Sequence, residues 1–235
     1  MRRTLVMLAL GALASAALVA QARDSSAPNT LTPEERAAGW RLLFDGRTTA
    51  GWRGYRKTAM PEGWQVIDGA LTRTGAGGDI VTVEQFGSFE LAFEWTIAPA
   101  GNSGVMFRVT EERDYPWQSG PEYQILDNAG HANGLTPQTS AASDYDLHAP
   151  AKDMTRPAGS WNASRLVVNG NHVEHWLNGE KVVAYEIGSP DWIERVKKSK
   201  FAKYENWGLA PRGHIALQDH GDRVAYRNIK IRATQ

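Results

Sequence analysis

Side chains of three different chemistries fall close together in the stretch NSGVMFRVTEERDYPWQSGPEYQILD, residues 102–127. If its two alternating segments are neighbouring strands, Arg108, Glu122 and Gln124 share one face, and apolar residues take the other. A carboxyl can act as a general acid or base, and a guanidinium can stabilise negative charge that develops on an oxygen. A solvated outer face is the ordinary alternative, but it needs no such mixture of groups. The pattern therefore predicts a catalytic face.

A second acid–base group is expected near the C-terminus, in the motif LQDHG, residues 217–221. His220 in this motif follows a strand, and histidine is the side chain whose ordinary pKa lies nearest to neutral pH. The alternative is a histidine that only stabilises a turn. We interpret His220 as the partner of Glu122, with the division into acid and base left open.

Period-2 alternation predicts the strands that must position these residues. FELAFEWTI, residues 89–97, alternates strictly, and residues 64–74 and 165–187 follow the same rule. Asn169-Gly170 and Asn178-Gly179 are hairpin turn signals. Residues 214–233 are expected to close the chain as a last pair of strands around Asp219–Asp222. Many short antiparallel strands predict an all-β fold, an antiparallel β-sandwich with one or two short helices.

Two short helices interrupt the β pattern. Thr32 is expected to cap the first, with Pro33 as its first residue, Glu35 completing a capping box and Gly39 ending it. Ser189-Pro190 starts the second. Its apolar stripe is expected to be Trp192, Ile193 and Val196. The polar segment 130–160 is a long loop, which we expect to wall a site.

The N-terminus has the pattern of a cleaved secretory signal. MRR precedes a mostly apolar run, Leu5–Ala20, and the small-residue exit AQA ends at Ala22. The expected organisation is therefore a signal peptide over 1–22, a tether and capped helix over 23–38, and a β-sandwich catalytic domain over 39–235. Cleavage near Ala22 predicts a periplasmic or secreted protein, and no later segment is long and apolar enough to cross a membrane.

Composition excludes some classes of function. Lys+Arg and Asp+Glu both number 26, so the basic excess of a nucleic-acid-binding protein is absent. With no cysteine, the protein depends on its core for stability and not on disulfides. Nine tryptophans suit either a sandwich core or platforms for sugar rings.

Eight segments together resemble a known family. LLFDGRTTAGW, WQVIDGALT, FELAFEWTI, NSGVMFR, PEYQILD, WLNGEKV, SKF and IALQDHGDRVAYRNI look like the 3-keto-disaccharide hydrolase domain, in the right order over roughly residues 39–233. The resemblance implies a concanavalin A-like jelly-roll sandwich. It also implies a 3-keto-glucoside 1,2-lyase followed by a 3-keto-2-hydroxy-glucal hydratase, with net hydrolysis of a 3-keto glycoside.

This chemistry needs a base near C2, a donor or a metal ion facing the C3 oxygen, and a proton donor for the leaving group. We expect Glu122 and His220 to share the acid–base work, with Arg108 facing the C3 oxygen. The expected substrate-binding residues are Gln124, Asn102, Ser103, Asp127, Trp117, Gln218 and Lys200. The chain shows no nicotinamide-binding signature, so a partner oxidoreductase would have to supply the ketone.

Two other functions remain open at this stage. EYQILD has the spacing of the carboxylate signature of retaining glycosidases, with Glu122 as nucleophile and Asp127 as acid. However, Gln124 replaces the middle carboxylate, and residues i and i+5 of a regular strand face opposite sides unless a bulge intervenes. The third function is a lectin-like binding module, in which Trp117 and Trp161 would be sugar platforms.

A divalent metal ion is a further alternative for this site. His131, Asp127, Asp219 and His220 are of ligand type, but no dense metal motif occurs, so we expect no metal cofactor and leave a divalent ion as an open alternative. His172 and His175 differ by three positions and should face opposite sides of a strand.

Overall fold

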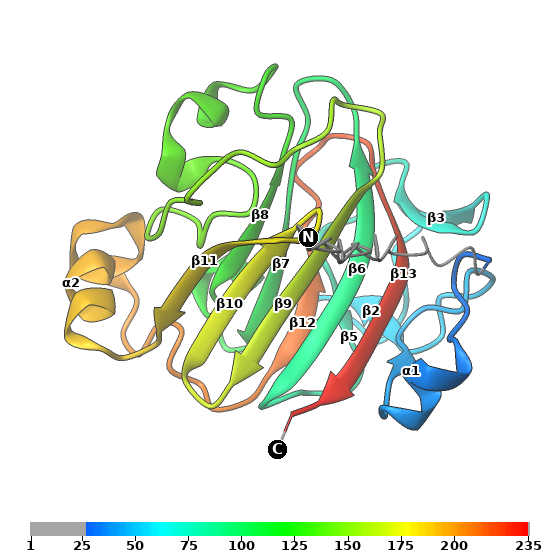
Figure 1. Ribbon diagram of the computed structural model, residues 1–235, viewed down its shortest axis with the longest axis horizontal. Coiled ribbons are helices and arrows are strands. Elements are labelled where there is room, and N and C mark those ends of the chain that lie inside the picture. Colours follow the sequence, from blue (N-terminus) through cyan, green and yellow to red (C-terminus); the bar gives the residue numbers. More distant parts are fainter. Residues whose placement is uncertain (1–26, 235) are drawn as a thin grey trace, which may run out of the picture.

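The computed structural model describes residues 27–234, so the expected signal peptide and its cleavage site lie outside the described residues. Two antiparallel sheets lie face to face, with the larger in front in Figure 1. The larger sheet has the order β11-β10-β9-β6-β13-β4-β3, with β1 paired to β13. The smaller sheet has the order β2-β5-β12-β7-β8. The prediction of an antiparallel β-sandwich is therefore confirmed.

The strands are β1 (Arg41–Leu42), β2 (Trp52–Gly54), β3 (Trp64–Ile67), β4 (Ala70–Arg73), β5 (Ile80–Thr82), β6 (Phe89–Ile97), β7 (Asn102–Val109), β8 (Glu122–Leu126), β9 (Asn162–Asn169), β10 (His172–Leu177), β11 (Glu180–Glu186), β12 (His214–Leu217) and β13 (Val224–Ala233). The helices are α1 (Pro33–Ala37) and α2 (Pro190–Lys198). Short 3₁₀ turns lie at Pro116–Gln118, Ala132–Leu135, Pro137–Thr139 and Lys200–Lys203.

The core fills the space between the two sheets, and β6 shows why. Its alternate residues Phe89, Leu91, Phe93, Trp95 and Ile97 are all buried and belong to the main apolar cluster, as the alternation predicted. Each fully buried side chain of this size contributes about 1.5–3 kcal/mol relative to exposure. This apolar face holds the sheets together, and it leaves the outer faces to polar side chains.

Hairpin turns form where the sequence predicted them. Asn178 and Gly179 have φ values of 50° and 91° between β10 and β11, as a two-residue hairpin turn requires. Gly170, with φ of 56°, lies between β9 and β10. Alternation along β10 places His172 and His175 on opposite sides of the strand, as predicted. His172 contacts Glu186 at the surface, whereas His175 is fully buried.

Residues 214–233 form the two predicted strands, β12 and β13, on either side of Asp219–Asp222, but the two strands do not pair with each other. β12 pairs with β5 and β7 in the smaller sheet, whereas β13 pairs with β4 and β6 in the larger one. The turn residues bind neighbouring loops instead of closing a hairpin. The Asp219 carboxylate accepts hydrogen bonds from the backbone of Gly77 and Gly78, and that of Asp222 from the backbone of Asn102.

The helices follow their end signals. Thr32 and Glu35 form the predicted capping box of α1, and Ser189 accepts a hydrogen bond from the backbone of Trp192 at the start of α2. The predicted stripe of α2 is wrong at Ile193, which is 41% exposed, because it lies about 100° around the helix from the buried Trp192. None of the helices in residues 27–234 is long and apolar enough to cross a membrane.

Candidate active site

The outer face of the smaller sheet carries the predicted chemistry. The register pairs Glu122 of β8 with Met106 of β7, and Met106 with Ala216 of β12. Gln124 pairs with Gly104 on the same face, two residues farther along β8. As predicted, Val105 and Tyr123 point the other way, into the core. The outer face therefore has a polar half beside an apolar half.

The Glu122 carboxyl lies flat against the sheet. A Cβ atom added at Gly104 would come within 2.2 Å of Glu122 Oε1, so only glycine leaves room for the carboxyl there. With its amide nitrogen directed toward Glu122, Gln124 donates to that oxygen at 3.0 Å and to the Ser103 carbonyl at 2.9 Å. Glu122 is only 4% exposed. Glycine and the neighbouring amide thus hold a buried carboxyl in one place.

Burial raises the pKa of Glu122 to about 8. The Lys200 ammonium opposes this rise, and the negative charges of Asp79 and Asp144 add to it. At neutral pH the carboxyl therefore carries a proton, and it can donate that proton to a substrate oxygen.

Three side chains from distant segments stand beside Glu122. The Lys200 ammonium lies 4.1 Å from the ring centre of Tyr145 and 5.0 Å from that of Trp117. Burial lowers the pKa of Lys200, while the Glu122 carboxylate raises it. Tyr145 belongs to the long segment 130–160, and its backbone N–H donates to the Glu122 carbonyl at 3.0 Å. The structure thus brings the predicted residues Lys200 and Trp117 together with Glu122.

The other tryptophan weighed as a sugar platform lies elsewhere. Trp161 is covered by the guanidinium of Arg227, 4.0 Å from its ring centre, on the larger sheet.

A row of amides joins Glu122 to His220. The Gln124 amide lies 3.3 Å from the Asn102 amide, and Asn102 Nδ2 lies 3.4 Å from His220 Nε2. His220 is exposed, and this row connects it to Glu122 only through two amide groups. Its assignment as the second acid–base residue stays a prediction.

Arg108 is not part of this face, contrary to the prediction. Its φ is 54°, and the register between β7 and β12 shifts at this point, so the alternation that should have placed it beside Glu122 is broken. Its guanidinium donates to the Gly170 carbonyl and to Asn171 Oδ1 (3.3 Å), both in the turn between β9 and β10 of the other sheet. Arg108 therefore bridges the two sheets and cannot face a C3 oxygen at Glu122.

Ser103 and Asp127 are also placed away from the site. The Ser103 hydroxyl is fully buried in the interior, where it donates to the Gln218 carbonyl and meets the Tyr226 hydroxyl, both at 2.8 Å. Asp127 follows the end of β8 and accepts from the backbone of Ala100 at 2.8 Å. The register of β7 and β8 runs without a bulge, so nothing rotates Asp127 to the side of Glu122.

Sequence reasoning missed Asp79, which comes directly before β5. Ile80 is in the main core and Val81 is in the outer-face cluster, so alternation puts Asp79 on the outer face. Its Oδ1 accepts from the Asp219 N–H at 2.7 Å. Burial raises the pKa of Asp79 to about 6; the Asp219 hydrogen bond lowers it and the Asp219 charge raises it. The segment GDIVT carried the signal, since its alternation continues that of the strand.

A cavity of about 230 Å³ opens beside Asp79. Tyr55, Tyr115 and Asp219 form part of its lining. Asp219 is itself paired with Arg73 at 2.5 Å. Gln218, next to this pair, is 8% exposed, and its buried Oε1 has no hydrogen-bond partner among residues 27–234. An unpartnered buried acceptor of this kind calls for an explanation, and a substrate hydroxyl would satisfy it.

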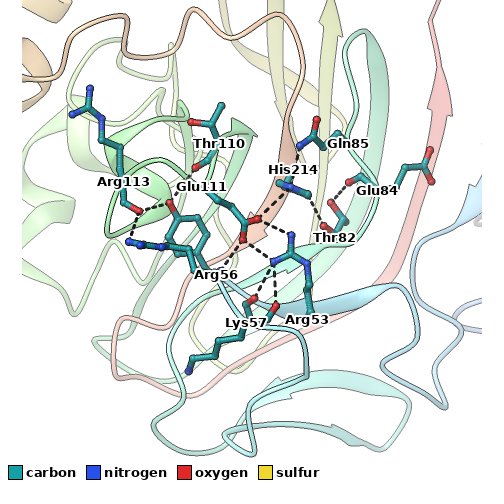
Figure 2. Close-up of polar contacts among 12 residues, drawn as sticks. Arg53, Arg56, Lys57, Thr82, Glu84, Gln85, Thr110, Glu111, Arg113 and His214 are labelled. Atoms are coloured by element: carbon teal, nitrogen blue, oxygen red, sulfur yellow. Dashed lines mark hydrogen bonds and ion pairs between the residues drawn. The ribbon is translucent and has the colours of Figure 1, made fainter.

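The end of this face around Glu111 differs from the region around Glu122, because its charged side chains form ion pairs with one another. Figure 2 shows Glu111 directed toward Arg53 and His214. Arg53 binds both Glu111 oxygens, at 2.6 and 2.8 Å, and His214 Nδ1 lies 2.7 Å from the Thr82 carbonyl. The Tyr55 hydroxyl donates to the nearby Arg113 carbonyl at 2.7 Å. This network holds Tyr55, which lines the cavity, in place, and it pairs the charges of Glu111 and Arg53 with each other.

The candidate metal ligands are not gathered into one cluster. His131 Nδ1 accepts a hydrogen bond from the backbone of Asn133, Asp127 closes a turn and Asp219 binds Arg73. Within the described part of the chain, no three His, Asp or Glu side chains lie together in a way that could hold a metal ion.

Two antiparallel sheets that pack face to face define a jelly-roll β-sandwich. The family model of the 3-keto-alpha-glucoside-1,2-lyase-like domain matches residues 39–232, so the chain belongs to this family. A protein of Bacteroides thetaiotaomicron named 3-keto-disaccharide hydrolase is 33% identical over 229 residues, which cover 83% of this chain and 79% of that protein.

Solved structures agree with this assignment. A crystal structure of a proposed glycosyl hydrolase from Parabacteroides distasonis has a TM-score of 0.83 at 34% identity, covering 89% of this chain and all of that one. A second proposed glycosyl hydrolase from the same organism has a TM-score of 0.64 at 26% identity, over 83% and 99% of the two chains.

Proposed function

We propose that this protein is an enzyme that hydrolyses 3-keto glycosides by elimination followed by hydration. The name of the Bacteroides relative and the description of the family support the substrate class. The observation that carries the proposal is the Glu122 carboxyl, which is buried over Gly104 and keeps its proton at neutral pH. Such a group suits proton donation to a leaving oxygen.

The reaction starts from the acidity that the C3 ketone gives to the proton on C2. A base removes this proton, and an enolate forms between C2 and C3. The C3 carbonyl is restored as the C1–O bond breaks, and Glu122 protonates the departing oxygen. Water then adds at C1 and a proton returns to C2, so the net result is hydrolysis.

Residues around Glu122 supply its environment. The amide of Gln124 fixes Oε1, which leaves Oε2 for the transferred proton. The Lys200 ammonium stabilises the carboxylate that remains after donation, because its positive charge lowers the Glu122 pKa. We place the sugar against Trp117 and Gln218, whose aromatic ring and free acceptor suit a pyranose.

The proposal also includes export and a partner. The segment 1–22 would direct the chain to the periplasm or the medium, and a partner oxidoreductase would make the ketone.

The test compares a plain disaccharide with its 3-keto derivative, in water and in deuterium oxide, with sugar release as the readout. We expect cleavage of the keto form alone, with deuterium at C2 of the product. Cleavage of the plain sugar without exchange would support a two-carboxylate glycosidase instead. Binding of either sugar with no cleavage would support a lectin-like module.

A further inference from the structure

We infer that Asp79 is the general base that removes the C2 proton, working opposite Glu122 across the row of Gly104 and Gln218. This inference rests on the proposed function and assigns the catalytic role that it leaves vacant. It also replaces His220 with Asp79 as the partner of Glu122.

The register places Asp79 in line with the site. Ile80 pairs with Leu217, and Leu217 pairs with Val105. Because the strands are antiparallel, a step of one residue from these pairs places Asp79 beside Gln218, and Gln218 beside Gly104. The hydrogen bond from the Gln218 N–H to the Gly104 carbonyl, at 3.0 Å, agrees with this alignment. Asp79 and Gly104 thus stand two strands apart on the same face.

The two carboxyls stand on opposite sides of this row. Strands lie about 4.8 Å apart, so the backbones of Asp79 and Gly104 are separated by about 10 Å. The Glu122 carboxyl already covers Gly104. Paired carboxyls that act on a glycosidic bond are about 5–9.5 Å apart, and a sugar ring fits between them. The row therefore offers the spacing of an acid–base pair.

Access and hydrogen bonding also favour Asp79 over His220. Asp79 lines the cavity of about 230 Å³, and the Asp219 N–H fixes its Oδ1. Its Oδ2 accepts no hydrogen bond from residues 27–234 that would compete with a substrate. Between the two carboxyls lies Gln218, whose Oε1 needs a donor such as a sugar hydroxyl. His220, in contrast, is joined to Glu122 only through the amides of Asn102 and Gln124.

The protonation states match the two roles. With pKa values of about 6 for Asp79 and about 8 for Glu122, the first is mostly ionised and the second mostly protonated at pH 7. A base and an acid in these states are ready without any prior proton exchange. The other titratable groups that influence Asp79 and Glu122 are Asp219, Asp144 and Lys200.

Each carboxyl group regains its starting protonation state over one cycle. The Asp79 carboxylate takes the C2 proton, and the electron pair of the C2–H bond forms the enolate. The enolate pair then makes the C1–C2 double bond while the C1–O bond breaks, and Glu122 gives its proton to the leaving oxygen. In the hydration step the Glu122 carboxylate takes a proton from a water molecule as the oxygen of that water bonds to C1. The proton on Asp79 exchanges with solvent while the unsaturated ketone is bound, and Asp79 then delivers a solvent-derived proton to C2.

The experiment is Asp79→Asn, assayed on two 3-keto glucosides that differ only in the leaving group. In one substrate the leaving group is a second sugar, whose oxygen must be protonated as it departs. In the other it is 4-nitrophenolate, which departs without protonation. The asparagine keeps an oxygen for the Asp219 N–H, so folding should be retained, and thermal unfolding checks this. We expect kcat/KM to fall by about 10²–10⁴-fold with both substrates, because both need the C2 proton removed. Deuterium exchange at C2 should fall equally.

Glu122→Gln supplies the contrast and Asp68→Asn the control. Glu122→Gln should lose activity toward the sugar leaving group and keep most of it toward 4-nitrophenolate. Asp68 is exposed in the turn between β3 and β4 of the larger sheet, away from this cavity, and its φ of 51° is one that asparagine also adopts, so Asp68→Asn should match the unmodified protein.

Two results for Asp79→Asn would overturn the inference. One is activity within a few-fold of the unmodified protein. The other is a loss confined to the sugar leaving group, which would make Asp79 the acid. Inactivity of the unmodified protein on both 3-keto substrates would instead overturn the proposed function.

Discussion

The outer faces of the two sheets use the same residue types in opposite ways. On the larger sheet, Glu90 lies between Arg165 at 2.8 Å and Arg232 at 2.5 Å. On the smaller sheet, Glu122 is equally buried, but no salt bridge reaches its carboxyl from the described residues. Each lies in a regular strand, Glu90 in β6 and Glu122 in β8, and each points to the outer face of its sheet.

The difference lies in the neighbours and not in the carboxyl itself. Glu90 has a guanidinium on each adjacent strand, β9 and β13, so its carboxylate is neutralised by ion pairs on both sides. Glu122 has Met106 opposite it and glycine beneath its carboxyl, and its pKa therefore rises. Perturbed pKa values that lack a structural partner mark functional sites. A polar outer face is thus informative only when its charges are left unpaired.

The comparison predicts the largest effect for matched Glu→Gln variants. Glu122→Gln should lower kcat/KM for a 3-keto disaccharide by about 10³-fold, because an amide cannot donate the proton. Glu90→Gln should leave kcat/KM unchanged, since Glu90 faces away on the other sheet. Steady-state kinetics with both purified variants checks this. A similar loss in the two variants would show that Glu122 acts only through stability.

The sequence was sufficient for the features that depend on local alternation. The β6 core face and the capping box of α1 follow from residues close in sequence, and so does the outward direction of Glu122 and Gln124. The direction of the Arg108 side chain could not be predicted, because its positive φ interrupts the alternation of side chains between the two faces of the strand. Alternation gives no warning of such a bulge.

Asp79 was missed for a different reason. It lies 43 positions before Glu122 in the chain, and only the strand order β5-β12-β7-β8 brings them to one face. Strand order depends on long-range pairing, which the periodicity of one segment does not reveal. The burial that raises the two pKa values comes from the same pairing.

A second prediction concerns stability as a function of pH. The pKa of Glu122 is about 8 in the folded protein and 4.5 in its ordinary state. The folded state therefore binds the proton more tightly, so stability is highest below pH 4.5 as far as this group is concerned, and it falls as pH rises toward 8. The slope is about 1.4 kcal/mol per pH unit over that window, and Asp79 adds to it in the same direction up to about pH 6.

Glu122→Gln should remove its part of this slope. Urea unfolding at pH 5 and pH 8 measures it, and we expect the variant to be more stable than the unmodified protein at pH 8 by a few kcal/mol. Glu90→Gln should do the reverse and lose stability, because two guanidinium groups lose their partner. A variant at position 122 that is less stable at pH 8 would mean that the carboxylate is paired in the folded state, and the contrast between the faces would fail.

The smallest effect is expected at Glu94, on the larger sheet. Its carboxylate accepts hydrogen bonds from Arg227 at 2.7 Å and Asn228 at 2.9 Å, and its side chain is 27% exposed. Solvent screens a pair of this kind, so Glu94→Gln should cost at most about 1 kcal/mol and leave activity unchanged. For a chain of this size the melting temperature should fall by about 2–4 °C at most. A larger fall would show that the paired face stabilises the sandwich more than screened ion pairs can, and that both faces depend on their carboxylates.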